Sequence, residues 1–190
     1  MAKALVVVDV QNDFVEGGAL GVNGGLIVSR RLNDWVATQH WNYDLIVASQ
    51  DWHIDPGSHW SDNPDYVDSW PVHCAADTLG AALTGDWDWA VDVVVKKGQY
   101  AAAYSAFEGV TRFGKLLNDW LSFSDITEVD VVGIAYDYCV KATALDSVTA
   151  GFKTRILTDL TAPVHQDKVG ELEHELQTAG VELALSGLTV

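Results

Sequence analysis

Short runs of apolar, largely β-branched residues recur along this chain and alternate with segments of helical periodicity. The runs cover residues 4–8, 45–49, 91–95, 129–134, 155–158 and 181–185. Several are apolar at nearly every position, which is typical of strands buried on both faces of a parallel sheet. Strand–helix alternation of this kind predicts an α/β fold with a doubly wound sheet and right-handed crossovers.

Helical periodicity marks four segments, at residues 26–41, 110–121, 138–151 and 169–179. Each carries apolar residues along one side, as a helix packed against a sheet requires. Gly151 and Gly180 follow the last two segments and are expected to end them. Asp137 precedes the third segment and is expected to cap its first turn.

Size and charge limit the kinds of partner. The chain has 190 residues, 48% of them hydrophobic, which suits a single domain over residues 1–190 with its own core. Its formal net charge of −16 repels phosphate backbones and anionic membranes, so we expect neither nucleic acid nor a membrane surface as a partner. The same charge fits either plain solubility or a high-salt habitat.

Cysteine usage and apolar run lengths point to a compartment. Two cysteines, Cys74 and Cys139, do not make a disulfide scaffold in a chain that can build a core. The apolar run after Met1 is too short for a signal peptide, and no stretch approaches the length of a membrane helix. We therefore expect a cytoplasmic protein with reduced thiols.

A long segment at about 51–90 has little periodicity, but it holds Asp51, His53, His59 and His73. Loops of this length inside a compact domain are usually functional or disordered, and its five tryptophans argue against disorder. Asp51 and His53 alternate in an extended segment, so they can converge on one ion, and the loop could bring the other two histidines to it. Mixed imidazole and carboxylate ligands suit Zn, Fe or Mn. Spacing alone leaves a metal site and a set of polar turn residues equally open.

Three further groups stand at the predicted carboxyl ends of strands, where open α/β sheets bind ligands. Asp9 follows the first strand and could act as a general base, although a turn Asp that caps a backbone amide is the simpler reading. Cys139 lies where a strand leads into a helix, and a helix N-terminus can lower a thiol pKa and bind an oxyanion. A buried structural Cys is the commoner fate of a lone thiol.

Lys97 is the third group, and it follows a second lysine, Lys96, in the sequence. A cation at this position could stabilise a thiolate and a developing oxyanion, whereas the adjacent Lys96 favours the alternative of a solvated lysine. Alternation along a strand lets only one of the two face a given side. Together with Asp51, the three strand-end residues should open onto one edge of the sheet.

With these residues in this order, the sequence resembles the nicotinamidases (pyrazinamidases) of the isochorismatase-like hydrolase superfamily. The resemblance covers essentially the whole chain, in order, and rests on several separate motifs: Asp9; Asp51-Trp52-His53 with His59; Ser69-Trp70-Pro71-Val72-His73-Cys74; Lys97-Gly98; Tyr104-Ser105-Ala106-Phe107-Glu108-Gly109; and Gly133-Ile134-Ala135-Tyr136-Asp137-Tyr138-Cys139-Val140.

The resemblance implies a three-layer α/β/α fold with a mostly parallel, roughly six-stranded sheet. It implies hydrolysis of nicotinamide to nicotinate and ammonia, and of pyrazinamide to pyrazinoate, through a cysteine thioester. Cys139 would be the nucleophile, Asp9 its general base and Lys97 the cationic partner. One divalent Zn, Fe or Mn ion would be held by Asp51, His53, His59 and His73.

The same resemblance assigns the substrate pocket. Backbone amides near Ala135 and Cys139 would hold the oxyanion, and the Ile134–Ala135 bond matches a position that is often cis. The implied substrate-binding residues are Phe14, Trp70, Tyr104, Ile134, Ala135 and Tyr138. Tyr136 stands where the motif usually has Thr, and Tyr138 where His is common. Because both flank Cys139, they bear on pocket size and on the preference among ring amides.

Two alternatives remain open. One is another amidase of the superfamily that acts on a carbamoyl or other small amide, although the metal ligands favour a substrate with a pyridine-type nitrogen. The other is a non-catalytic scaffold domain in which the same ligands hold a closed structural zinc. Such a site needs neither Cys139 nor Lys97 at a strand end. The oligomeric state is left open.

Overall fold

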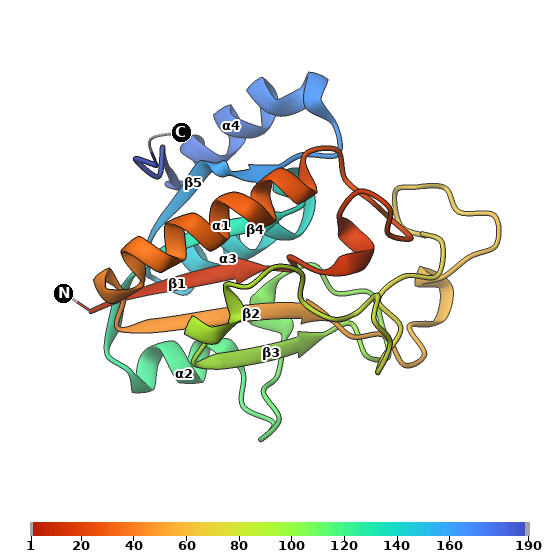
Figure 1. The fold of residues 1–190 in the computed structure, drawn as a ribbon, viewed down its shortest axis with the longest axis horizontal. Helices are drawn as coiled ribbons and strands as arrows, with labels where there is room; N and C mark the ends of the chain where they lie inside the picture. Colours follow the sequence, from red (N-terminus) through yellow and green to blue (C-terminus); the bar gives the residue numbers. More distant parts are fainter. Residues whose placement is uncertain (1, 189–190) are drawn as a thin grey trace.

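The computed structural model describes residues 2–188, and its centre is one parallel sheet (Figure 1). The sheet order is β3-β2-β1-β4-β5-β6, and every neighbouring pair runs parallel. This confirms the predicted α/β class. The strands are β1 (Ala2–Val8), β2 (Leu45–Asp51), β3 (Val93–Lys97), β4 (Ile126–Ile134), β5 (Lys153–Ala162) and β6 (Glu182–Ala184).

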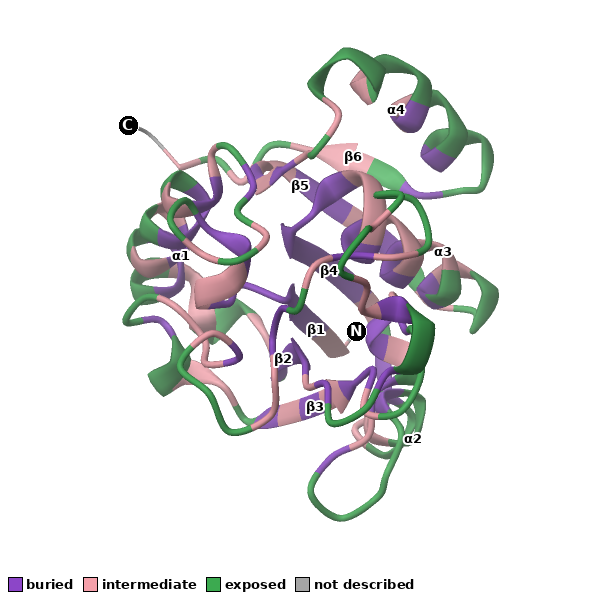
Figure 2. Ribbon diagram, turned by 90° about the vertical axis from the view of Figure 1, so that its right-hand side faces the viewer, coloured by how far each residue is buried: buried purple, intermediate pink, exposed green. Residues whose placement is uncertain are grey.

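Helices cover both faces of the sheet, which gives the three layers (Figure 2). Helix α1 (Gly25–Gln39) packs on one face, and α2 (Leu117–Phe123), α3 (Lys141–Thr149) and α4 (Val169–Thr178) pack on the other. Alternate residues of β1 separate the two cores, because successive side chains of a strand point to opposite faces. Val6 therefore packs with α2, α3 and α4, whereas Val7 packs with α1.

The predicted helix at 110–121 was wrong over its first half. Helix α2 begins only at Leu117. Before it, Val110 forms an isolated antiparallel bridge with Lys96, and Gly114 takes a left-handed conformation with φ 72° in a turn. Phe113, expected on the buried stripe, is 67% exposed. The apolar spacing was real, but the turn interrupts the helical path that would have aligned it.

The segment after β2 is ordered by local contacts and not by long helices or strands. A 3₁₀ turn spans Gly57–His59, and the Asp65 carboxylate accepts hydrogen bonds from the backbone N–H groups of Val67, Asp68 and Ser69. Within the part of the chain that the structure describes, no helix is both long and apolar enough to cross a bilayer.

The strand order places a topological switch between β1 and β4. From β1 the chain builds outward through β2 and β3, and from β4 it builds in the opposite direction through β5 and β6. Ligands in doubly wound sheets bind in the crevice at such a switch, outside the carboxyl ends of the strands. Asp9 and Cys139 follow the carboxyl ends of these two strands.

Candidate functional site

Asp9 follows β1 directly and is fully buried. Its backbone adopts the left-handed region, with φ 47°, which turns the chain sharply out of the strand. The Ser49 hydroxyl donates a hydrogen bond of 2.7 Å to one carboxylate oxygen, Oδ1. The other oxygen, Oδ2, lies 2.9 Å from Nζ of Lys97 in an ion pair. Ser49 lies in the adjacent strand β2 and Lys97 ends β3, the strand beyond it, so the sheet itself fixes the position of the carboxylate.

Lys97 ends β3 and is the buried member of the lysine pair. Its ammonium forms a close ion pair with Asp51 and donates to the Ala103 carbonyl at 3.0 Å and to the Cys139 sulfur at 3.6 Å. A carboxylate oxygen of Asp9, one of Asp51 and the Cys139 sulfur all lie within 4.8 Å of one another. One ammonium thus joins two acids and a thiol from four different strand ends.

Cys139 lies in a π-helical turn, Tyr136–Val140, that links β4 to α3. The Ile134–Ala135 peptide just before it is cis. Burial raises the pKa of the Cys139 thiol well above its usual value; Lys97 opposes this shift, and Asp9 and Asp51 add to it. The sequence argument considered a pKa lowered by the helix N-terminus. Burial among carboxylates reverses that direction, so the thiol needs a base at the moment it reacts.

The two acids around Lys97 differ in how readily they accept a proton. Burial raises the pKa of Asp9, with Lys97 acting against it. Burial also acts to raise the pKa of Asp51, but Lys97 and His53 together bring it below its usual value. For Lys97 itself, burial acts to lower the pKa, yet the two carboxylates hold it well above its usual value. Of the two acids, Asp9 is therefore the one suited to take a proton.

Three imidazoles converge beside Asp51, and each has its Nδ1 next to a backbone carbonyl. The distances are 2.5 Å from His53 to Gly98, 2.7 Å from His73 to Pro71 and 3.3 Å from His59 to Asp68. A carbonyl accepts only, so each Nδ1 carries a hydrogen, which leaves Nε2 as the ring nitrogen that can bind an ion. Metal-binding histidines are oriented in this way.

The Nε2 atoms of these imidazoles face a common point. Nε2 of His53 and of His73 are 3.2 Å apart, and they lie 3.6 Å and 3.9 Å from Oδ2 of Asp51. Burial lowers the pKa of His59, and it lowers that of His73 to about 4, so both rings are neutral at pH 7. With a hydrogen on each Nδ1, both Nε2 atoms can face one divalent cation. Three imidazoles and one carboxylate suit such an ion.

Gly98 shows how closely this group is packed. It has φ 71°, and a Cβ built there would lie 2.6 Å from Cε1 and 2.8 Å from Nδ1 of His53. The glycine carbonyl is also the acceptor that orients the same ring. The Lys97-Gly98 pair of the sequence therefore supplies the ammonium with one residue and the clearance for His53 with the next.

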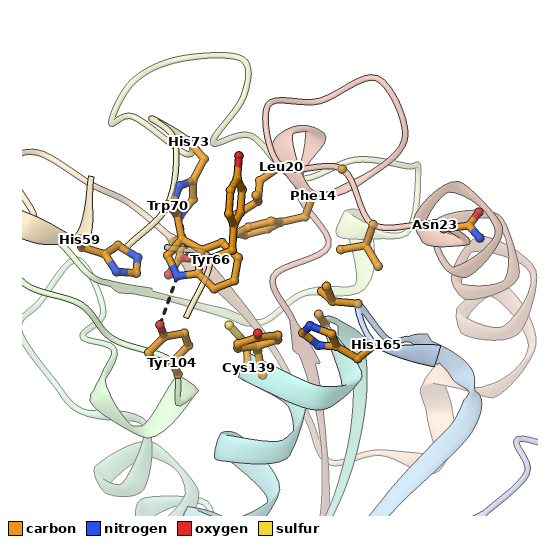
Figure 3. Close-up of a pocket in the computed structure, with 16 residues that line it drawn as sticks. Phe14, Leu20, Asn23, His59, Tyr66, Trp70, His73, Tyr104, Cys139 and His165 are labelled. Carbon is orange, nitrogen blue, oxygen red and sulfur yellow. Dashed lines mark hydrogen bonds and ion pairs between the residues drawn. The ribbon is translucent and has the colours of Figure 1, made fainter. Parts of the chain in front are cut away.

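A cavity of about 360 Å³ opens above the sulfur and the histidines (Figure 3). Asp51, His59, His73 and Cys139 all contribute to its wall, whereas Asp9 and Lys97 lie buried beneath it. Its remaining lining residues are Phe14, Leu20, Gly21, Val22, Asn23, Tyr66, Trp70, Tyr104, Ala135, Tyr138, Val164 and His165.

Most of the expected pocket residues lie in this wall. The Trp70 indole N–H donates to the Tyr104 hydroxyl at 3.3 Å, and the Trp70 ring meets that of Tyr138 edge-on at 5.3 Å between centroids. Ile134 is a correction: its side chain is fully buried in the core beneath α1 and does not line the cavity. Ile134 ends β4 with its side chain turned into the core, so only its backbone could contact a substrate in the cavity.

Tyr136 and Tyr138 point in different directions. Tyr136 is buried in the core on the α2–α4 side, so it does not narrow the cavity as its place beside Cys139 suggested. Tyr138 does form part of the wall. Asp137, expected to cap the helix, instead accepts hydrogen bonds from the backbone N–H groups of Val164 and His165, both at 2.8 Å.

Several lining residues carried no signal in the sequence. Tyr66 and His165 both border the cavity, although neither belongs to a motif identified in the sequence. Each lies on a connection that reaches the cavity only through the tertiary fold. The one feature of the sequence that could have placed His165 at the cavity is its position just after β5, whose carboxyl end lies at the same edge of the sheet.

The comparisons with known proteins agree with this geometry. A model of the isochorismatase domain matches residues 3–184. The chain belongs to the isochorismatase domain family. Among relatives, a nicotinamidase/pyrazinamidase of Mycobacterium tuberculosis is 49% identical over 185 residues, which cover 97% of this chain and 99% of that protein. The resemblance seen in the motifs is thereby confirmed.

Solved structures of the isochorismatase domain family show the same fold. A pyrazinamidase of Pyrococcus horikoshii in complex with zinc superimposes with a TM-score of 0.84 at 31% identity, covering 97% of this chain and 99% of that one. PnC1 from L. infantum in complex with nicotinate gives a TM-score of 0.86 at 33% identity, covering 100% and 95%.

Proposed function

We propose that this member of the isochorismatase domain family hydrolyses nicotinamide to nicotinate and ammonia, and pyrazinamide to pyrazinoate, through a thioester on Cys139. Similarity to a nicotinamidase/pyrazinamidase over 97% of this chain, and to a nicotinamidase of Escherichia coli over 83% of it, supports the substrate. The observation that carries the chemistry is the single buried ammonium of Lys97 between Asp9, Asp51 and the Cys139 sulfur. A purely structural core would have no reason to bury an ammonium, two carboxylates and a thiol together, because each costs free energy to desolvate.

In the first half-reaction Asp9 takes the proton of the Cys139 thiol while the sulfur attacks the carboxamide carbon. The raised pKa of Asp9 suits it to hold that proton and then to give it to the departing ammonia. Backbone N–H groups near Ala135 and Cys139 would stabilise the tetrahedral oxyanion, and Lys97 offsets the negative charge on the sulfur.

In the second half-reaction a water attacks the thioester carbon, and Asp9 accepts a proton from that water. The carbon–sulfur bond breaks, Asp9 returns its proton to the leaving sulfur, and the acid leaves as nicotinate after releasing its own proton to solvent. The aromatic wall of Phe14, Trp70, Tyr104 and Tyr138 would hold the ring during both steps.

We further infer that Asp51, His53, His59 and His73 hold one divalent cation, of which Zn, Fe and Mn fit the ligand set. The inward-facing Nε2 atoms and the neutral imidazoles support this. When bound, the ion would supply a Lewis-acid contact for the ring nitrogen. Asp51, His59 and His73 border the cavity, which disfavours the closed zinc of a scaffold domain.

Ammonia release from nicotinamide tests the proposal. Cys139→Ala should abolish it, because the nucleophile is lost, while Cys74→Ala is the matched control for removal of a buried thiol. Near-wild-type turnover by Cys139→Ala would refute the mechanism. A chelator arm tests the cation: activity should fall on metal removal and return with an added divalent ion. Rates on a panel of carbamoyl and other small amides separate the proposed substrate from the alternative amidase activity.

A further inference from the structure

The cavity extends beyond the space that a single-ring amide needs at the sulfur and the histidines. At about 360 Å³ it falls in the range that holds drug-sized ligands. Figure 3 shows His59 and His73 on one side, Cys139 at the floor and His165 on the side away from the two histidines. The far side therefore offers room that neither the proposed cation nor the thiol occupies.

His165 is held in a defined orientation there. The Asp137 carboxylate accepts from its ring Nδ1 at 2.9 Å and from the backbone N–H groups of Val164 and His165 at 2.8 Å each. A carboxylate only accepts, so Nδ1 carries the hydrogen and Nε2 is left as the outward edge of the ring. Among residues 2–188, no hydrogen bond engages Nε2, and the side chain is 39% exposed.

Tyr138 completes this side of the cavity. Its ring packs against the His165 imidazole at 5.9 Å between centroids and against Trp70 at 5.3 Å. The two residues thus form a continuous wall: an aromatic face near the sulfur, then a fixed polar edge farther out. Nothing in the proposed reaction of nicotinamide uses that polar edge.

We propose that the Tyr138–His165 wall is a second subsite, and that it extends the substrates to ring amides carrying a neutral hydrogen-bond donor. This rests on the proposed function. In nicotinamide one ring carbon, carbon 5, is adjacent to neither the ring nitrogen nor the carbon that bears the amide. With the nitrogen toward the histidines and the amide toward Cys139, a substituent on that carbon points away from both, toward His165.

The chemistry of the wall selects the substituent. In the tautomer that Asp137 selects, with the hydrogen on Nδ1, Nε2 is an acceptor, which a hydroxyl or amino group can satisfy. A carboxylate substituent is disfavoured, because Asp137 lies behind the imidazole and the chain carries a net charge of −16. The ligand class is therefore 5-hydroxy and 5-amino derivatives of the pyridine amide.

The experiment compares kcat/KM for 5-hydroxynicotinamide with that for nicotinamide in four proteins. The wild type should hydrolyse both. His165→Phe keeps a ring against Tyr138 but removes the acceptor, and the ratio of the two kcat/KM values should fall about 3- to 10-fold, the range for one lost hydrogen bond. His165→Gln keeps an acceptor and should restore most of the ratio. His174→Phe, the same change at an exposed position on α4, should leave the ratio as in the wild type.

The outcomes separate the subsite from the function. An unchanged ratio in His165→Phe, or a wild type that hydrolyses nicotinamide but not its 5-hydroxy derivative, overturns the subsite. Loss of the ratio in both His165→Phe and His165→Gln also overturns it, since the effect would then follow packing and not the acceptor. If nicotinamide itself is not hydrolysed, the proposed function fails. The subsite is then judged by calorimetry on Cys139→Ala, which should bind the 5-hydroxy derivative more tightly than His165→Phe does.

Discussion

Replacing Lys97 with methionine is the sharpest test of the buried charge cluster. Methionine keeps an unbranched side chain of similar length but removes the ammonium that pairs with Asp9 at 2.9 Å and closely with Asp51. Two buried carboxylates would then lie within 4.8 Å of each other without a cation. The variant must either tolerate that repulsion or keep one acid protonated.

Keeping one acid protonated sets the size of the expected loss in the free energy of unfolding. A carboxyl with an ordinary pKa of about 4 costs about 4 kcal/mol to protonate at pH 7, since each pKa unit corresponds to about 1.4 kcal/mol. This agrees with the roughly 3–5 kcal/mol lost when one partner of a buried ion pair is removed. With an m-value of about 2–3 kcal/mol per molar urea, the unfolding midpoint should fall by about 1–2 M.

The same reasoning fixes the pH dependence. In Lys97→Met the acid that stays protonated, Asp9, has a folded-state pKa raised further above its unfolded value. Its contribution favours folding below the unfolded pKa and is lost as pH rises through the folded pKa. The stability deficit relative to the wild type should therefore shrink as the pH falls from 7 toward 4, by up to about 1.4 kcal/mol per pH unit.

Urea titrations followed by tryptophan fluorescence at pH 7 and pH 5 measure both effects. Lys96→Met is the matched control, because its neighbouring ammonium lies over the Trp52 ring at 3.0 Å, and losing that contact should cost only about 0.5–1 kcal/mol. Adding Asp9→Asn to Lys97→Met removes one carboxylate and should recover part of the loss. Equal midpoints for the two lysine variants would refute the reasoning.

The remaining predictions concern the histidine group and the surface charge. Gly98→Ala should lower the divalent metal retained after dialysis, measured by elemental analysis, because the new Cβ meets His53. Gly114→Ala pays a similar backbone cost at φ 72° but meets no atom within 4 Å, and equal metal content in both would contradict the clash. The thermal midpoint should rise between about 0.1 and 1 M KCl, as the Debye length falls from about 10 to about 3 Å and screens the net charge of −16; a flat profile would oppose this.

The sequence was informative wherever position along a strand decides position in space. Asp9, Lys97 and Cys139 could be placed together because parallel strands end at one edge of the sheet. Strand alternation allowed only one of Lys96 and Lys97 to face the site, and the fold shows that Lys97 is the buried one. The predicted helix at 110–121 failed because the pattern does not reveal a turn at Gly114 that lets Val110 bridge to Lys96.

Other properties depend on the packed fold and have no local signature. His165 reaches the cavity because Asp137 holds the loop after β5, a contact across 28 residues of sequence. The raised pKa of the Cys139 thiol follows from burial and two nearby carboxylates, whereas the local strand-to-helix junction suggested the reverse. Ile134 belongs to the same sequence motif as Cys139, yet the pleat of β4 turns its side chain into the core.

Asp51 contacts both the Lys97 ammonium and the histidine group, and this gives the two acids different chemical properties. One of its oxygens meets Lys97, and the other faces the imidazole nitrogens of His53 and His73. Those contacts hold its pKa below the usual value, and a cation at the histidines would hold it lower still. Asp9 shares the same ammonium but has a serine hydroxyl in place of the imidazoles, and burial keeps its pKa raised. With one ammonium between two carboxylates, the acid with fewer stabilising partners is the one that can accept a proton, which supports the proposed roles of Asp9 as base and Asp51 as metal ligand.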